Sequence, residues 1–332
     1  MNRSRILPGV CWTVFCLMTA ARSLDALTLT GDVENDFMGA ETAKVVDGVG
    51  VADVGLPANW PYQPSGWDIK DVRFFYDRDN DVLYVGINFF GIAGDADGNG
   101  DPSGTSPPLT ALGGIDLANL GNSEAIQIRF DWNEDGVFDT IAGVPDDASG
   151  TAFSIAPDLE PTNDLPARSA RFGTPIAGIQ PFVGATGASA PDFEFKIPNV
   201  SALAGFDADA ARGFRFQVFA GSFQDDGIGE DRVANTGFVR VDLPDPAPTL
   251  ALTELIVSRS HFNFWGTATG ESIAAVEYKI DKKHWARFER AKGTTSWRFS
   301  IRRDGFQSLR VAIRAVNSDG TTSPEMVVEI QP

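Results

Sequence analysis

The sequence predicts an all-β protein built from two antiparallel β-sandwich domains, a larger one followed by a smaller one. Short segments of alternating apolar and polar residues recur along the 332 residues and are bounded by Gly, Asp, Asn and Pro. This is the pattern of half-buried strands joined by turns. Long helical periodicity is absent, and no strand–helix alternation indicates a parallel sheet. A proline-rich linker over 244–248 separates the two predicted domains, since closely spaced prolines favour an extended spacer.

The first 23 residues predict a secretory signal peptide. Two arginines precede an apolar core over 6–20, and residues 21–23 offer small side chains at a cleavage site. The apolar stretch is too short to span a membrane, so no membrane span is expected. Both cysteines, Cys11 and Cys16, lie in this segment. We therefore expect a secreted, extracellular or cell-surface protein without disulfides.

The larger domain, 24–243, contains six clear strand patterns. They cover 71–76, 82–89, 125–130, 192–197, 214–219 and 236–241. Residues 76–82 are typical of a hairpin turn, and 200–211 allow one short turn of helix. Residues 146–190 are rich in Pro and Ala, which predicts long surface loops with one or two strands.

The smaller domain, 249–332, contains seven further strand patterns. They cover 250–257, 262–268, 274–280, 285–289, 297–301, 308–316 and 325–330. That number of strands in fewer than a hundred residues fits an immunoglobulin-like sandwich.

The charge is divided between these two parts. Residues 24–248 hold 36 acidic and 12 basic residues, a net charge of −24, whereas 249–332 hold 9 acidic and 12 basic residues, a net charge of +3. The acidic part is unsuited to nucleic acid, and bound cations would relieve its self-repulsion. Both histidines, His261 and His284, lie in the basic part, so the acidic part has no His for zinc or for catalysis.

Two acidic, glycine-punctuated loops predict calcium sites. The donors are Asp95, Asp97, Asn99 and Asp101 in the first loop, and Asp131, Asn133, Asp135, Asp139 and the carbonyl of Val137 in the second. Oxygen donors at alternate positions around a glycine suit Ca²⁺, whose role here would be structural. Position twelve of the second loop is Ala142 and strands flank it, so it is not an EF-hand. The alternatives are acidic turns closed by Asx hydrogen bonds, or two loops that share one site or adjacent sites.

Other carboxylates suggest chemistry less strongly. The turn with Asp77, Asp79 and Asp81 and the group Asp225, Asp226, Glu230 and Asp231 are spaced for a metal, but solvated turns explain them better. Glu124 and Glu194 are the candidates for a carboxylate-pair glycosidase, against the simpler interpretation of surface acids on a sandwich. We therefore expect a protein that is not an enzyme.

An aromatic loop over 59–67 predicts a carbohydrate platform. Trp60, Tyr62 and Trp67 lie among Pro and Gly, and exposed aromatic faces stack on sugar rings. For Trp67 the alternative is packing under the edge of the sheet. Trp132, inside the second calcium loop, fits either role.

The smaller domain carries a basic face. Its residues are Lys279, Lys282, Lys283, Arg287, Arg290, Lys292, Arg298, Arg302 and Arg303. The default interpretation is a solvated face, and the sharper one is docking against an anionic cell-surface polymer or the protein's own acidic domain.

Two family resemblances accompany these observations. Residues 276–281, 293–297 and 310–320, together with Trp285, look like the bacterial Ig-like or fibronectin-III-like modules of secreted proteins, which are spacers or adhesion units.

Residues 31–37, 66–69, 75–77 and 82–87 resemble DOMON-type sandwiches and family 9 carbohydrate-binding modules, which have an early acidic strand. This second resemblance implies a jelly-roll-like sandwich that binds sugar or acts as a surface module. Haem is not implied, because the acidic domain has no His and only Met38 as a thioether.

The sequence therefore predicts a secreted, non-catalytic, calcium-binding module whose favoured ligand is a polysaccharide or cell-surface glycan. The alternative is a structural or adhesive component of an extracellular matrix or surface layer, in which calcium and the charge division mediate self-association. A glycoside hydrolase is the least favoured hypothesis.

Overall fold

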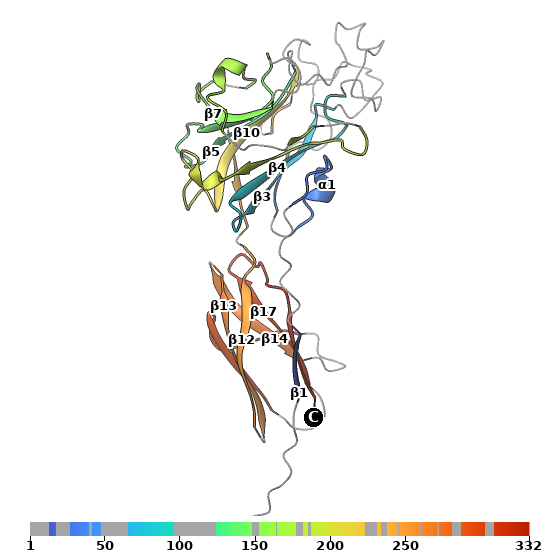
Figure 1. Ribbon diagram of the computed structural model, residues 1–332, viewed down its shortest axis with the longest axis vertical. Coiled ribbons are helices and arrows are strands. Elements are labelled where there is room, and N and C mark those ends of the chain that lie inside the picture. The colour runs from blue at the N-terminus through green and yellow to red at the C-terminus, as the bar shows by residue number, and fades with distance from the viewer. Residues whose placement is uncertain are drawn as a thin grey trace, which may run out of the picture. The chain divides into compact units, whose positions relative to one another are not determined.

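The regular secondary structure that the computed structural model describes is almost all antiparallel β-sheet, with three short helices (Figure 1). The structure describes residues 13–17, 27–39, 42–47, 66–95, 124–147, 153–163, 165–176, 182–184, 187–222, 231–233, 238–244, 246–258, 260–270, 272–280, 287–302 and 309–331. The chain divides into two compact units, one of residues 26–244 and one of residues 245–332 with residues 1–25. No helix in the described ranges combines the length and apolarity needed to cross a bilayer.

The larger unit contains two five-stranded antiparallel sheets. The first has the order β2 (Ala43–Val46), β3 (Ile69–Asp77), β4 (Val82–Phe89), β9 (Phe193–Pro198) and β8 (Phe182–Val183). The second has the order β11 (Val239–Asp242), β10 (Gly213–Ser222), β5 (Glu124–Asp131), β6 (Thr140–Gly143) and β7 (Ser154–Pro157). Short helices are α1 (Val33–Asp36), η1 (Ser169–Arg171) and η2 (Val200–Ala202).

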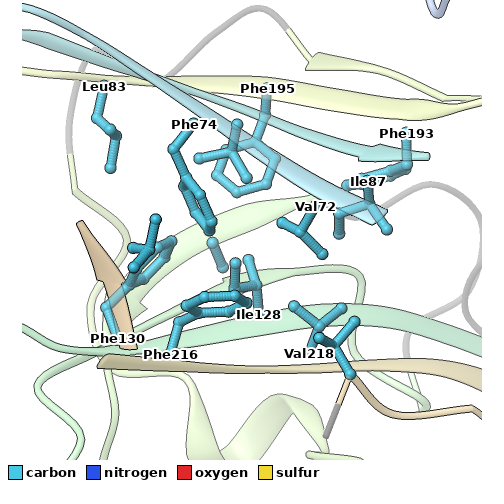
Figure 2. Packing of buried hydrophobic residues seen from close by; sticks show 14 of the residues in the cluster. Val72, Phe74, Leu83, Ile87, Ile128, Phe130, Phe193, Phe195, Phe216 and Val218 are labelled. Atoms are coloured by element: carbon cyan, nitrogen blue, oxygen red, sulfur yellow. The ribbon is translucent and has the colours of Figure 1, made fainter. Parts of the chain in front are cut away.

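The core of this unit lies between the two sheets, where aliphatic and aromatic side chains from both meet (Figure 2). Phe74 of β3 contacts Phe214 and Phe216 of β10 edge to face, with ring centroids 5.3 and 4.8 Å apart. Such aromatic pairs add about 0.5–1.5 kcal/mol each beyond their buried area. Because every second strand residue points inward, the alternation in the sequence produces this two-layer sandwich.

Both outer faces of the sandwich are partly covered as well. Residues 27–37 pack Val33 and Phe37 over Phe75 and Tyr84 on the outside of the first sheet. On the second sheet, residues 153–176 bring Leu165, Ala167 and Phe172 against Ala125, Ile141 and Phe219 in a second, smaller core.

The stretch predicted as surface loops over 146–190 is therefore partly a packed cover. Its two strands, β7 and β8, agree with the prediction of one or two strands. A buried ion pair fixes the cover, with Arg171 Nε donating to Asp158 Oδ1 at 2.8 Å. This packing was not predicted, because the stretch has little apolar periodicity. Isolated Leu, Ala and Phe residues make its contacts with the second sheet.

The smaller unit has a five-stranded and a three-stranded antiparallel sheet. The first has the order β1 (Thr13–Leu17), β18 (Met326–Gln331), β17 (Leu309–Asn317), β14 (Ile273–Ile280) and β15 (Glu289–Arg290). The second has the order β12 (Thr249–Val257), β13 (His261–Thr269) and β16 (Ser296–Arg302). Phe299 stacks between Tyr278 and Phe264, at centroid distances of 4.0 and 4.6 Å, in the core of this unit.

The segment predicted as a signal peptide contributes strand β1. Val14 pairs with Ile330 and Phe15 with Glu329 of β18. An extended apolar segment readily adds to an open sheet edge, since it satisfies the edge's backbone groups. If this segment is removed on secretion, β18 becomes an edge strand.

The strands that were predicted agree with the structure mostly within one to three residues at each end, whereas β2 and β6 of the larger unit were not predicted. One expectation was wrong: the early acidic strand implied by the DOMON resemblance is helical at α1. Asp32 caps this turn, since its Oδ1 accepts the Asn35 N–H at 3.2 Å. The strand expected over 285–289 lies partly outside the described residues, and β15 includes only its last residue, Glu289.

Candidate functional site

The second predicted calcium loop connects β5 to β6 and begins at a rigid point. Asp131 is fully buried, and Trp132 stacks on Phe130 with ring centroids 4.4 Å apart. The indole N–H of Trp132 donates to the Thr140 hydroxyl at 2.9 Å, which ties the start of the loop to the start of β6. Trp132 is therefore a core residue and takes no part in an exposed carbohydrate platform.

Side-chain oxygens of the loop accept its own backbone N–H groups. Asp131 accepts from Asp135 at 3.1 Å and from Gly136 at 3.0 Å, one through each carboxylate oxygen. Asn133 Oδ1 also accepts from Asp135, and Asp135 Oδ1 accepts from Val137 at 2.8 Å. Gly136 has φ +89°, a conformation that glycine adopts without strain. These are the Asx contacts of the alternative interpretation.

Three of the four carboxylates of the loop, those of Asp131, Asp135 and Asp139, nevertheless repel one another. Burial raises the pKa of Asp131, and the charge of Asp135 raises it further. Burial likewise raises the pKa of Asp139, with Asp131 and Asp135 both contributing. A bound cation would remove this repulsion, because it favours the ionised form of each group.

The donor set fits calcium in its chemistry. It consists only of oxygens, and each carboxylate has about four lone-pair positions, so N–H bonds leave acceptor capacity. Within the described ranges, no set of three or more acidic, His or Cys side chains is arranged as it stands to hold a metal ion. Because the side chains point toward the loop's own N–H groups, calcium binding would require them to rotate. Calcium binding by this loop therefore stays a prediction.

Glu134 is the one acidic side chain of this loop that is held by arginines. Arg240 Nε donates to its Oε1 at 2.7 Å, and Arg215 Nε lies 3.5 Å from its Oε2. The arginines fix the back of the loop to β10 and β11.

The first predicted loop is described only at its start. Asp97, Asn99 and Asp101 lie outside the described residues. Asp95 is buried, its carbonyl accepts the Gly66 N–H at 2.8 Å, and its own N–H donates to the Ile92 carbonyl at 2.8 Å.

The two loops start at opposite ends of the sandwich. The Phe206 ring lies 5.8 Å from Tyr76 and 5.4 Å from Trp132, so the second loop lies beside the β3–β4 turn. Asp95 follows Phe89, which is at the other end of β4. Because Asp97, Asn99 and Asp101 lie outside the described residues, the hypothesis that the two loops share one site or form adjacent sites stays a prediction.

Trp67 does not belong to a carbohydrate platform. Only 1% of its surface is exposed, and it packs in the central core. Its ring faces are covered by protein, so the alternative of a packed Trp67 is correct, and the packing is in the core and not specifically under the sheet edge. Trp60 and Tyr62, the other members of the predicted platform, lie outside the described residues.

The acidic turn between β3 and β4 is a structural turn. Asp81 accepts the Tyr76 hydroxyl at 3.0 Å and the Ser201 hydroxyl at 2.6 Å, so it attaches η2 to the turn. Asp77 accepts the N–H of Asn80 at 3.1 Å.

The second acidic group is described only at Asp231, which accepts the Ile69 N–H at 2.7 Å. Asp225, Asp226 and Glu230 lie outside the described residues.

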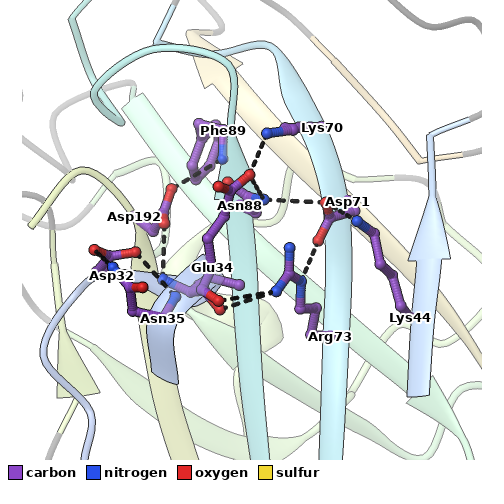
Figure 3. Close-up of polar contacts among 11 residues, drawn as sticks. Asp32, Glu34, Asn35, Lys44, Lys70, Asp71, Arg73, Asn88, Phe89 and Asp192 are labelled. Atoms are coloured by element: carbon purple, nitrogen blue, oxygen red, sulfur yellow. Dashed lines mark hydrogen bonds and ion pairs between the residues drawn. The ribbon is translucent and has the colours of Figure 1, made fainter. Parts of the chain in front are cut away.

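The sequence did not reveal a group of buried carboxylates that holds the N-terminal segment on the first sheet, and Figure 3 shows one of them, Asp192. Asp192 accepts the N–H groups of Val33 at 2.9 Å and Phe89 at 3.0 Å. Glu194 accepts the Gly31 N–H at 2.6 Å. Burial raises the pKa of Asp192 to about 7 and that of Glu194 to about 8. Nearby Asp36 adds to the shift of Glu194.

A second cluster beside it surrounds Asp71, which is fully buried on β3. Lys44 Nζ and Arg73 Nε contact its two carboxylate oxygens at 2.9 and 2.7 Å, and Asn88 donates to it at 3.0 Å. Arg73 also donates to the Val33 carbonyl at 3.2 Å, so the cluster continues into α1 (Figure 3). The sequence did contain one signal for the first group of carboxylates. Because side chains alternate along a strand, Asp192 and Glu194 lie on the face opposite Phe193 and Phe195.

The position of Glu194 does not suit a glycosidase. Its side chain is fully buried beneath residues 30–33, where it holds backbone in place. Glu124, the other glycosidase candidate, is described only in its backbone. It lies at the start of β5 and pairs with Ser222.

No protein-family model matches this chain, and no curated protein shows significant sequence similarity to it. The resemblances to DOMON-type and Ig-like modules therefore stay predictions.

Proposed function

We propose that this chain is a secreted, non-catalytic, calcium-binding module that acts outside the cell and has a glycan as its ligand. The main support for calcium binding comes from the 131–139 loop. It combines an all-oxygen donor set, a buried and rigid starting point and three mutually repelling carboxylates. Calcium would supply charge compensation and would fix the connection between β5 and β6, a structural role.

Calorimetric titration of Ca²⁺ into the secreted protein tests this part. We expect binding that is lost when Asp131 and Asp139 are both replaced by Asn, while the same replacement of Asp207 and Asp209 serves as a control. The control residues lie in an exposed or half-exposed turn and carry the same charge. Calcium binding that survives the first pair of replacements contradicts the assignment to this loop.

In the proposed fold, the larger sandwich is jelly-roll-like and related to DOMON domains, and the smaller one is Ig-like. The glycan part rests on Trp60 and Tyr62 in their Pro- and Gly-rich loop, since such rings suit stacking on sugars. Trp60→Ala and Tyr62→Ala should each abolish binding to the glycan and leave the melting temperature unchanged.

The absence of catalysis is supported by the buried position of Glu194, which leaves no accessible carboxylate at that position. Turnover of any polysaccharide by the purified protein contradicts this part of the proposal.

A structural or adhesive role is the second candidate, favoured by the division of charge between a part with net −24 and a part with net +3. Opposite charges on two parts of one chain promote association between copies. Light scattering should then show calcium-dependent self-association that weakens in high salt and after charge reversal in the basic part.

A further inference from the structure

The smaller unit contains an open surface hollow of about 540 Å³ on the three-stranded sheet, which we call the basic cavity. Its wall includes Trp265, Thr267, Lys292, Ser296, Trp297 and Arg298. The size is in the range of sites that hold small molecules or one or two sugar rings.

Strand register explains why these side chains meet. Trp265 of β13 pairs with Arg298 of β16, and Thr267 pairs with Ser296, so both pairs lie on the same face of the sheet. Residues between them, such as Trp297, point to the core instead. The register of β12 shifts between Leu252 and Glu254, which leaves Thr253 as an extra residue on the cavity wall. Bulges often redirect a side chain in this way beside binding sites.

Lys292 is brought beside Arg298 by the chain that enters β16. The two residues exchange backbone hydrogen bonds, each 2.9 Å long. Both side chains are exposed. Two cations therefore lie at the mouth of one cavity, next to the hydroxyl groups of Thr267 and Ser296.

These two cations differ from several bases of the other sheet. Lys279 is paired with Glu325 at 2.8 Å and Arg314 with Glu277 at 2.8 Å. Neither Lys292 nor Arg298 has a side-chain ion pair or hydrogen bond within the described residues. Their positive charge is thus available to an anionic ligand.

Trp265 supplies the aromatic surface of the cavity, whereas Trp297, which also borders the cavity, lies on the core side of the sheet. Trp265 is half-buried, so part of its surface is free, whereas Trp297 is buried and lies flat against Gly266. A Cβ atom at position 266 would lie 2.0 Å from Trp297 Cζ2, so only glycine permits this packing. The indole N–H of Trp297 is buried on the core side of the sheet and finds no acceptor among the described residues.

We propose that the basic cavity binds an acidic sugar residue of an anionic polysaccharide. The sugar ring stacks on Trp265, its carboxylate pairs with Lys292 and Arg298, and its hydroxyl groups bond to Thr267 and Ser296. An aromatic surface combined with two cations and two hydroxyls matches a sugar acid better than a neutral sugar or a purely apolar ligand. The proposal does not rest on the calcium loop or on Trp60 and Tyr62, which belong to the larger unit.

The probe is a polygalacturonate oligomer, compared with the same oligomer fully methyl-esterified, which keeps the rings and removes the charge. Binding to the full chain, in the form that a secreting host releases, is measured by calorimetry. A chelator is present, because calcium itself bridges polyuronates. We expect binding of the acidic oligomer and at least about tenfold weaker binding of the ester, since charge-assisted hydrogen bonds are lost.

Variants of the cavity locate the site. Lys292→Gln combined with Arg298→Gln should weaken binding of the acidic oligomer at least about tenfold, because both charged contacts are lost. Arg290→Gln, an exposed base outside the cavity, should change it less than about twofold. Trp265→Ala should abolish binding and Trp265→Phe should retain part of it, and unchanged melting temperatures show that these proteins are folded.

Three results with the uronate oligomers overturn the proposal. The first is the absence of binding to the acidic oligomer, and the second is equal binding of the acid and its ester. The third is binding that is insensitive to the cavity variants. Equally tight binding of polyglutamate would show a general polyanion surface that suits an acidic protein segment, and it would overturn the assignment to a sugar. Glycan binding that needs calcium and Trp60 but survives the cavity variants supports the proposed function while contradicting this inference.

Discussion

The replacement Asp135→Asn should change the stability of the larger unit in opposite directions with and without calcium. Asp135 is exposed, and its charge raises the pKa of both Asp131 and Asp139. Without calcium, the replacement removes this repulsion and keeps Oδ1 as acceptor for the Val137 N–H. The gain should be small, about 0–1 kcal/mol, because exposed charges interact weakly in water.

With calcium, the same replacement removes a charged ligand. At a calcium concentration a hundred times Kd, binding adds about 2.7 kcal/mol to the free energy of unfolding. If Asn weakens binding about a hundredfold, only about 0.4 kcal/mol remains, a loss of about 2.3 kcal/mol. For a unit of this size the melting temperature would fall by about 5–9 °C.

The assay is a thermal melt of wild type and Asp135→Asn in calcium and in EGTA. Asp79→Asn is the matched control, since Asp79 is an exposed acid in the β3–β4 turn and carries the same charge. We expect EGTA to destabilise wild type and the control equally and to affect Asp135→Asn little. The reasoning is refuted if EGTA lowers all three melting temperatures equally, or lowers none.

Two further predictions concern the larger unit. The protonated form of Glu194 is favoured in the folded state, because burial raises its pKa from 4.5 to about 8. Its contribution to stability is therefore full below about pH 4.5 and is lost as pH rises toward 8. Between pH 5 and 9 in saturating calcium, the melting temperature of wild type should fall several degrees more than that of Glu194→Gln; parallel curves would contradict this. Trp67→Ala should cost about 3–5 kcal/mol in urea unfolding, because a large core side chain is lost, and a loss below about 1 kcal/mol would show that Trp67 is not a core residue.

The strands could be predicted because alternation of apolar residues is itself the physical cause of a two-layer sandwich. Phe74, Phe130 and Phe216 all lie at inward positions that the sequence pattern indicates. The single turn of α1 could not be found in this way, because four residues carry no helical periodicity and a capping contact from Asp32 defines it.

The candidate site was predicted only in part. The positions of the 131–139 donors follow from their spacing, but their N–H contacts depend on how the loop closes. The burial of Asp192 and Glu194 depends on the N-terminal segment that covers them, a contact between residues about 160 positions apart. The basic cavity likewise depends on the register of β13 with β16, which sequence alternation alone does not determine.

The central claim is that this protein binds glycans outside the cell with the support of calcium. The most direct test is binding of the secreted protein to a broad polysaccharide panel, in calcium and again with a chelator. We expect binding to at least one polysaccharide, and we expect it to weaken when calcium is removed. Absence of binding in both buffers would contradict the glycan assignment and favour the structural or adhesive role.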